Sequence, residues 1–209
     1  QEAAATTAAV ETTTAATVET TAATEAQKES SGGKHKIYLI TMDQMDQHWV
    51  NVDAGAKKAV EELGNVDYTW LAPDVKDDAK QIECVNNAVS GGAKAILVAA
   101  NGPDAITASL EAAANEGVKI VYVDSAANFP GIQTLATDNK AAGKTAGEEM
   151  IKALEAKGVT EGKIGIINVN AATASTVARE EGFRSAFEGT KFEILETQYG
   201  EGDAVKSKD

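Results

Sequence analysis

Three polar segments of the sequence carry residue types that could bind a small polar molecule, and each follows a short apolar run. Residues 41–49 include Asp43, Asp46, His48 and Trp49, residues 101–104 are Asn-Gly-Pro-Asp, and residues 124–125 are Asp-Ser. Carboxylates accept hydrogen bonds from hydroxyl groups, and an indole ring can stack on the C–H face of a pyranose. Trp49 beside His48 and Asp46 therefore suits a sugar.

Each of these residues also has a purely structural interpretation. Trp49 could cap a helix and pack onto the edge of a sheet, and for this residue the two interpretations carry equal weight. For Asp124 we favour a ligand role, since a carboxylate at the end of a buried strand must find donors, although the backbone of the next loop could supply them. Asn101 in Asn-Gly-Pro-Asp is first of all a turn residue. Arg179, taken alone, indicates a surface ion pair with a neighbouring glutamate.

Sequence motifs for catalysis and for nucleotide binding are absent. No G-x-G-x-x-G follows the first strand, and neither a P-loop nor a G-x-S-x-G elbow occurs. Asp43 and Asp46 could suggest a phosphoacceptor site, but the third strand ends in Ala-Ala-Asn and lacks the Asp that this chemistry needs. A single cysteine, Cys84, excludes an internal disulfide, and with two histidines it does not make a zinc site. We predict a protein that is not an enzyme, with no cofactor and no metal.

Apolar runs of strand length alternate with segments of helical period from residue 34 onward. We expect strands at residues 37–41, 67–71, 95–100, 119–123 and 132–137, with helices between the first four, the first of them at residues 49–63. Strands joined by helical crossovers form a parallel sheet that is covered on both faces. Ligands bind beyond the carboxyl ends of such strands, so the three polar segments should share one edge.

The composition divides the chain into three parts. Residues 1–33 are rich in Ala, Thr and Glu and predict a disordered tether. Residues 34–137 predict an N-terminal α/β lobe. Residues 138–209 predict a partial C-terminal α/β lobe, with a helix that contains Ala142, Ala146, Met150 and Leu154, a strand at 163–169, a helix around 177–187 and a strand at 192–197.

The charge balance and the apolar content exclude two classes of partner. The net charge is −13, and Arg179 and Arg184 are the only arginines, which argues against nucleic acid as a partner. No window approaches the roughly 18 to 20 consecutive apolar residues of a membrane helix.

Five segments, taken in order, match one known family. They are the loop that runs into Trp49 and Gly55-Ala56, then Gly91-Gly92-Ala93-Lys94-Ala95-Ile96-Leu97, Val121-Tyr122-Val123-Asp124, Ala136-Thr137-Asp138-Asn139-Lys140-Ala141-Ala142-Gly143 and Ala178-Arg179-Glu180-Glu181-Gly182-Phe183. On these segments the chain resembles the type 1 periplasmic sugar-binding proteins of ABC transporters, which include ribose- and galactose-binding proteins. The resemblance implies an α/β, two-lobed type 1 periplasmic binding fold with parallel sheets. The family continues beyond the position of Asp209, so we expect the second lobe to be incomplete.

The resemblance also implies roles for individual residues. His48 and Trp49 replace the aromatic pair that sandwiches the sugar, and Asp46 takes the place of a loop residue that bonds hydroxyls. Asp124 and Arg179 bond the ring from the two lobes, which raises Arg179 from a surface residue to a ligand contact. Asp43 and Asn101 complete the candidate set.

Two departures from the family pattern argue against ribose as the ligand. Ribose-binding relatives usually carry Arg after the Asp of the fourth strand, where this chain has Ser125. Their Pro-Phe-Phe is replaced here by Gln47-His48-Trp49.

The function that the resemblance implies is that of an extracytoplasmic solute-binding protein that delivers a monosaccharide to an ABC transporter permease. The tether resembles the spacer behind the lipid-modified cysteine of Gram-positive binding proteins, which implies membrane contact only through a lipid anchor, on the cell surface or in the periplasm. The alternative is a sugar-sensing signalling or regulatory module of the same fold. A repressor of this kind would need a basic helix-turn-helix ahead of residue 34, and the acidic tether argues against it.

Overall fold

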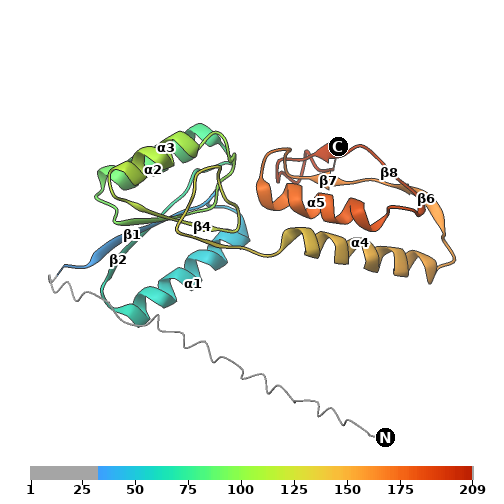
Figure 1. Ribbon diagram of the computed structural model, residues 1–209, viewed down its shortest axis with the longest axis horizontal. Coiled ribbons are helices and arrows are strands. Elements are labelled where there is room, and N and C mark those ends of the chain that lie inside the picture. The colour runs from blue at the N-terminus through green and yellow to red at the C-terminus, as the bar shows by residue number, and fades with distance from the viewer. Residues whose placement is uncertain (1–32, 209) are drawn as a thin grey trace, which may run out of the picture. The chain divides into compact units, whose positions relative to one another are not determined.

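A computed structural model describes residues 33–208 (Figure 1). The predicted tether, residues 1–33, lies outside the described residues except for Gly33. We call residues 33–137 the first lobe. Its elements are β1 (His35–Ile40), α1 (Gln47–Leu63), β2 (Val66–Leu71), α2 (Asp78–Ser90), β3 (Ala95–Val98), α3 (Thr107–Asn115), β4 (Lys119–Val123) and β5 (Gln133–Leu135).

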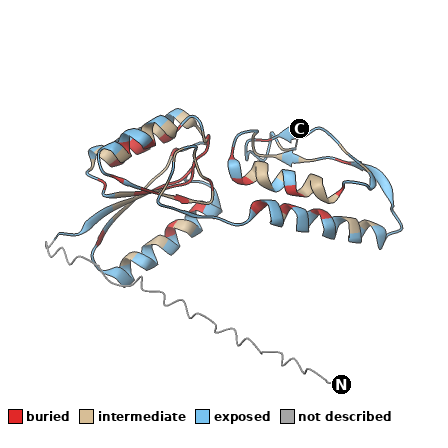
Figure 2. Ribbon diagram, viewed as in Figure 1, coloured by how far each residue is buried: buried red, intermediate tan, exposed pale blue. Residues whose placement is uncertain are grey.

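The first lobe is a five-stranded parallel sheet in the order β2-β1-β3-β4-β5. In Figure 1, α1 lies on one face of this sheet, and α2 and α3 lie on the other. Ile40, Ile96 and Tyr122 on the strands are almost completely buried, as are Val85 on α2 and Leu110 on α3. Figure 2 shows buried residues along the strands and on the helix sides that face them. This arrangement confirms the predicted α/β class and parallel sheet.

The strand ends of β1 and β3 are tied together by one side-chain amide. Gln81 on α2 is fully buried; its Nε2 donates to the carbonyl oxygens of Thr41 (3.1 Å) and Ala99 (2.8 Å), and its Oε1 accepts from the N–H of Asn101 (3.0 Å). Buried backbone groups need such partners, because an unpaired one costs about 1–3 kcal/mol. Gln81 thus fixes the loops that follow two neighbouring strands.

We expect Gln81→Leu to lower the free energy of unfolding by at least about 2 kcal/mol, because three buried backbone groups lose their partners at once. Urea denaturation followed by circular dichroism measures the change. Gln47→Leu, at an exposed position on α1, is the matched control and should stay within about 0.5 kcal/mol of the wild type. Equal stability of the two variants would contradict the role given to Gln81.

The second lobe, residues 138–208, contains α4 (Asn139–Glu155), β6 (Glu161–Ile164), β7 (Ile167–Asn168), α5 (Ala174–Ala186), β8 (Lys191–Ile194) and β9 (Gln198–Tyr199). Its strands form two separate two-stranded parallel sheets, β6–β8 and β7–β9. The single strand predicted at 163–169 is therefore divided between β6 and β7, and the strand predicted at 192–197 ends at Ile194, with β9 beginning beyond it. The cause is a register shift: Ile164 pairs with Ile194, but Ile167 pairs with Gln198, so one extra residue on the second strand interrupts the ladder.

The face of α4 that packs against α5 is formed by glycines. Ala146 and Met150 are exposed, whereas Gly143 and Gly147 are buried. A Cβ on Gly143 would lie 1.9 Å from the carbonyl oxygen of Arg179, so the backbones of α4 and α5 touch directly at this point. Glycine permits so close an approach because it has no side chain. This contact depends on small size and not on apolar surface.

Candidate ligand-binding site

The loops after β1 and β4 and the first turns of α5 line a cavity of about 260 Å³. Five of the seven predicted site residues contribute to its wall: Asp46, His48, Trp49, Asp124 and Arg179. The other wall residues are Met42, Lys76, Val169, Thr173, Ser175 and Thr176. Residues of both lobes therefore meet around one space, as the edge of a parallel sheet would require.

Asp124 lies in the cavity wall in an unusual backbone conformation. Its φ is 65°, in the left-handed region that non-glycine residues rarely adopt. The N–H of Ser125 bonds to the carbonyl oxygen of Val123 (2.8 Å), which closes a three-residue turn around Asp124, and the Asp124 N–H bonds to Leu135 (2.9 Å). Backbone strain of this kind persists only where neighbouring contacts enforce it, and it gathers at functional sites.

The Asp124 carboxylate has two protein partners and keeps free acceptor capacity. Its Oδ1 lies 2.9 Å from the Ser125 hydroxyl, and its Oδ2 lies 3.3 Å from His48 Nε2. An ionised carboxylate offers about four lone-pair positions, so about two remain for ligand hydroxyls.

His48 and Trp49 begin α1 under a cap supplied by Asp46, whose Oδ1 accepts from the His48 N–H (3.0 Å). The two rings meet edge to face, with centroids 4.5 Å apart. The His48 side chain is about half exposed, whereas Trp49 is 3% exposed and packs against Met42 and Ala99. Trp49 thus packs as a buried residue at the edge of the sheet, as its structural interpretation predicts, and it also forms part of the cavity wall.

Arg179 on α5 reaches the cavity with a partner that the sequence did not indicate. Its Nη2 donates to Oδ1 of Asn139, whose Nδ2 in turn donates to the carbonyl oxygen of Thr137 (3.0 Å). The preceding residue, Asp138, caps α4, and its side chain accepts from the Ala141 N–H. The buried Asn139 amide therefore orients the guanidinium.

The surface ion pair considered for Arg179 is not formed, because its neighbouring glutamates have other partners. Glu180 pairs with Arg184 (2.8 Å) and also accepts from Asn168 (2.9 Å), and Glu181 pairs with Lys140 (3.7 Å). Burial alone would raise the pKa of Glu180, but hydrogen bonds from the Thr197 hydroxyl, Asn168 and Arg184, together with the Arg184 charge, leave its pKa below its usual value.

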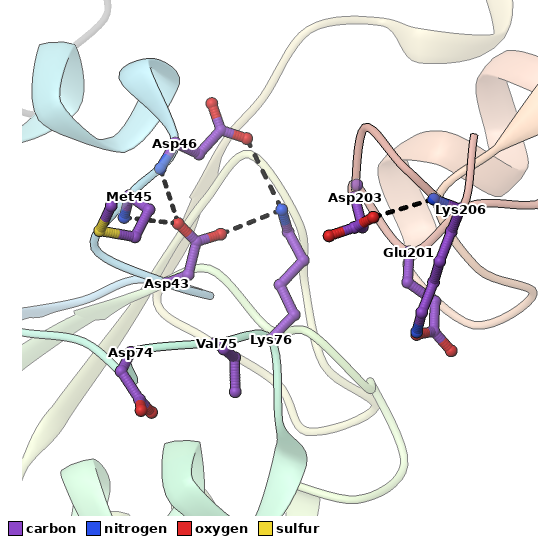
Figure 3. Close-up of a pocket in the computed structure, with 10 residues that line it drawn as sticks. Asp43, Met45, Asp46, Asp74, Val75, Lys76, Glu201, Asp203 and Lys206 are labelled. Carbon is purple, nitrogen blue, oxygen red and sulfur yellow. Dashed lines mark hydrogen bonds and ion pairs between the residues drawn. The ribbon is translucent and has the colours of Figure 1, made fainter. Parts of the chain in front are cut away.

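Asp43 and Asn101 do not line this cavity, and both hold loops in place. Asp43 is buried; its Oδ1 accepts from the N–H groups of Met45 (2.8 Å) and Asp46 (2.7 Å). Burial alone would raise the pKa of Asp43, but these bonds and the Lys76 ammonium, 3.0 Å from Oδ2, leave its pKa below its usual value (Figure 3). The Asn101 amide donates to Asp78 (2.6 Å). We therefore leave Asp43 and Asn101 out of the ligand set proposed below.

Lys76 is the main wall residue that the sequence analysis missed. It lies in the loop between β2 and α2, its side chain is 18% exposed, and its Nζ is also 3.6 Å from Asp46 Oδ2. Figure 3 shows it beside a second cavity, of about 590 Å³, which Glu201, Asp203 and Lys206 of the second lobe also line. The loop after β2 lies at the same edge of the sheet as the loop after β1, and this position could have indicated Lys76 from the sequence.

Two searches over the described residues, 33–208, bear on other classes of site. No three His, Cys, Asp or Glu side chains there are grouped so that they could hold a metal ion. No helix in that range has both the length and the apolar content to cross a membrane.

A parallel sheet whose strand-end loops face the start of a helix from a second α/β lobe, across a cavity lined by acceptors and aromatic rings, defines a two-lobed binding protein. Residues 37–209 match the family described as periplasmic binding protein domain, and the chain belongs to this family. The predicted resemblance and fold class are thereby confirmed.

Similar proteins with known names are sugar-binding proteins. The chain is 27% identical over 183 residues to the ribose import binding protein of Haemophilus influenzae, covering 87% of this chain and 60% of that protein. It is 31% identical over 125 residues to the D-apiose import binding protein of Actinobacillus succinogenes, covering 58% and 39%. The chain thus spans at most about 60% of the length of these relatives.

Solved structures show the same likeness. A carbohydrate transporter solute-binding protein from Agrobacterium radiobacter, in complex with D-arabinose, has a TM-score of 0.79 and 29% identity, covering 84% of this chain and 61% of that one. A solute-binding protein from Agrobacterium vitis with bound D-fucose has a TM-score of 0.72 and 28% identity, covering 82% and 60%.

Proposed function

We propose that the protein binds one monosaccharide between its lobes and delivers it, outside the cytoplasm, to the permease of an ABC transporter. The ligand contacts are Asp46, His48, Trp49, Asp124 and Arg179. The names of the relatives support a sugar, and the departures at Ser125 and at His48-Trp49 favour a sugar other than ribose. Attachment through a lipid anchor ahead of residue 33 belongs to the same proposal.

The observation that carries this proposal is the Asp124 carboxylate in its strained turn at the cavity wall, with acceptor capacity to spare. Charge-assisted hydrogen bonds from hydroxyls to a carboxylate are among the strong ones in proteins. The cavity of about 260 Å³ lies just below the roughly 300–1,000 Å³ of pockets for drug-sized ligands, which favours a single sugar ring.

In this proposal Asp124 accepts hydrogen bonds and does not act as a catalytic base. Its imidazole neighbour, His48, is paired with the carboxylate itself, and the Ser125 hydroxyl is bonded to that same carboxylate. A nucleophile is activated by a base within hydrogen-bond reach, and among the described wall residues no hydroxyl has a hydrogen bond to His48.

We expect Asp124→Asn to weaken sugar binding about 10- to 100-fold, because hydrogen bonds to a charged group contribute about 1.5–3 kcal/mol. Asn also tolerates the left-handed backbone, so the turn should survive. Calorimetry against a panel of aldopentoses, aldohexoses and amino acids measures both ligand and affinity. Asp104→Asn, exposed and outside the cavity, removes the same charge and should bind like the wild type. Binding of amino acids alone, or equal affinities for the two variants, would rule out the proposal.

A further inference from the structure

Two buried serine hydroxyls meet where the lobes come together. Ser125 follows β4 in the first lobe, and Ser175 lies in the first turn of α5 in the second. Their Oγ atoms are 2.7 Å apart, and the residues are 1% and 6% exposed. At this level of burial water does not compete for the hydroxyls, so the hydrogen bond between them is stronger than it would be at an exposed position.

The chemistry of the groups fixes the direction of the protons. Ser125 Oγ lies within bonding distance of both Ser175 Oγ (2.7 Å) and Asp124 Oδ1 (2.9 Å), but a hydroxyl has a single proton to donate. An ionised carboxylate only accepts. The proton of Ser125 therefore points to Asp124, and the proton of Ser175 points to Ser125. The chain of bonds runs from the second lobe, through Ser125, to the carboxylate.

We propose that Ser125 and Ser175 form a hydroxyl relay that couples the contact between the lobes to the orientation of the Asp124 carboxylate. In the relay both are positioning residues, since they act on a ligand through Asp124; Ser175 also lines the cavity. The Ser175 donor polarises the Ser125 hydroxyl and strengthens its bond to Oδ1. This bond fixes the position of Asp124 Oδ1. When the lobes meet, the remaining acceptor positions of the Asp124 carboxylate are therefore directed into the cavity. The functional meaning of this relay rests on the proposed sugar binding.

A second hydrogen bond between the lobes supplies the matched comparison. Thr173 Oγ1 donates to the carbonyl oxygen of Asn101 (2.8 Å), and Thr173 is 2% exposed. This bond is as buried as the serine pair, but it ends on a backbone group that does not touch Asp124. Thr173→Val therefore removes a lobe contact of the same kind without entering the relay.

The test combines single and double substitutions with two measurements. Spin labels at Glu62 on α1 and Glu155 on α4, both exposed, in a Cys84→Ala background report the distance between the lobes without any ligand. Calorimetry with the best sugar of the panel reports affinity. Ser175→Ala places a good helix former in the first turn, so the fold should survive. Ser185 lies on the same helix, but its hydroxyl donates to the carbonyl oxygen of Gly182, so Ser185→Ala controls for the loss of a serine.

We expect Ser175→Ala and Ser125→Ala each to broaden the distance distribution and to weaken binding about two- to tenfold, the range of one net hydrogen bond. Ser175→Ala should weaken binding clearly less in the Ser125→Ala or Asp124→Asn protein than in the wild type. Ser175→Thr, which keeps a hydroxyl, should bind like the wild type. Thr173→Val should broaden the distances but add its full effect to Ser125→Ala.

Additive effects of Ser175→Ala in all backgrounds, or wild-type distances in both serine variants, would overturn the relay. If the wild type binds no sugar at all while the distances still show the non-additive pattern, the proposed function fails and the relay stands. If sugar binds and the serine substitutions are additive, the relay fails and the proposed function stands.

Discussion

Replacing Gly143 by alanine should separate α4 from α5 and weaken ligand binding at least tenfold. The new Cβ would lie 1.9 Å from the carbonyl oxygen of Arg179, and a backbone atom cannot move aside as the end of a long side chain can. The helices must therefore part, which we expect to cost about 3 kcal/mol, the upper end of what overpacking usually costs. Because Arg179 itself forms the contact, its guanidinium would lose its place beside Asn139.

The same substitution elsewhere in the chain provides the control. Gly55 is an exposed residue of α1, and a Cβ there would meet nothing within 4 Å. Gly55→Ala should therefore stabilise the protein, by about 0.5–1 kcal/mol, through the helix propensity of alanine. Urea denaturation measures the change in stability, amide hydrogen exchange of residues 139–186 measures the separation of the helices, and calorimetry measures ligand binding. If Gly143→Ala behaves like Gly55→Ala, the close helix contact described above does not exist in solution.

Replacing Trp49 by alanine should destabilise the first lobe by about 3–5 kcal/mol, the usual cost of truncating a large buried aromatic residue. Trp49 is 3% exposed and packs against Met42 and Ala99, so most of its surface contributes to packing and not to the cavity. Sugar binding should weaken as well, because the ring forms part of the cavity wall. Thermal denaturation measures the first effect, and calorimetry below the midpoint measures the second.

His48→Ala separates these two contributions. His48 lines the same cavity, but its side chain is about half exposed, so its removal should weaken binding with little change in stability. Trp49→Phe should keep most of the packing and part of the wall. A Trp49→Ala protein as stable as His48→Ala would show that the packing around the indole contributes little.

The first lobe could be predicted closely because its central strands, β3 and β4, are short apolar runs. The segment predicted at residues 119–123 coincides with β4, and a helix, α3, precedes it as predicted. The division of the second-lobe strands could not be predicted, since it depends on a one-residue register shift between segments about 30 residues apart. Periodicity reports which side of an element is apolar, but not its partner's register.

Site residues could be predicted where their position at the edge of the sheet decides their role. They could not be predicted where hydrogen bonds to other protein groups decide it. Asp46, His48 and Asp124 follow strands and line the cavity, as their positions indicate. Asp43 has the same kind of position, but its carboxylate is occupied by loop amides. Gln81 on α2 was missed because a buried amide on a helix looks like any exposed glutamine in the sequence. Only the three-dimensional partners distinguish the two cases.

The order of the strands along the chain has a consequence for how the protein is made. Every pairing of the five-stranded sheet joins segments between His35 and Leu135, so no strand of the described first lobe comes from later in the sequence. Domains generally fold as units during synthesis, from the N-terminus onward. On the ribosome, the first lobe can bury Ile40, Ile96 and Tyr122 before α5 has left the exit tunnel. The emerging α5 then meets a surface that the five-stranded sheet has already formed, and the half of the cavity that contains Asp124 exists before its opposite wall.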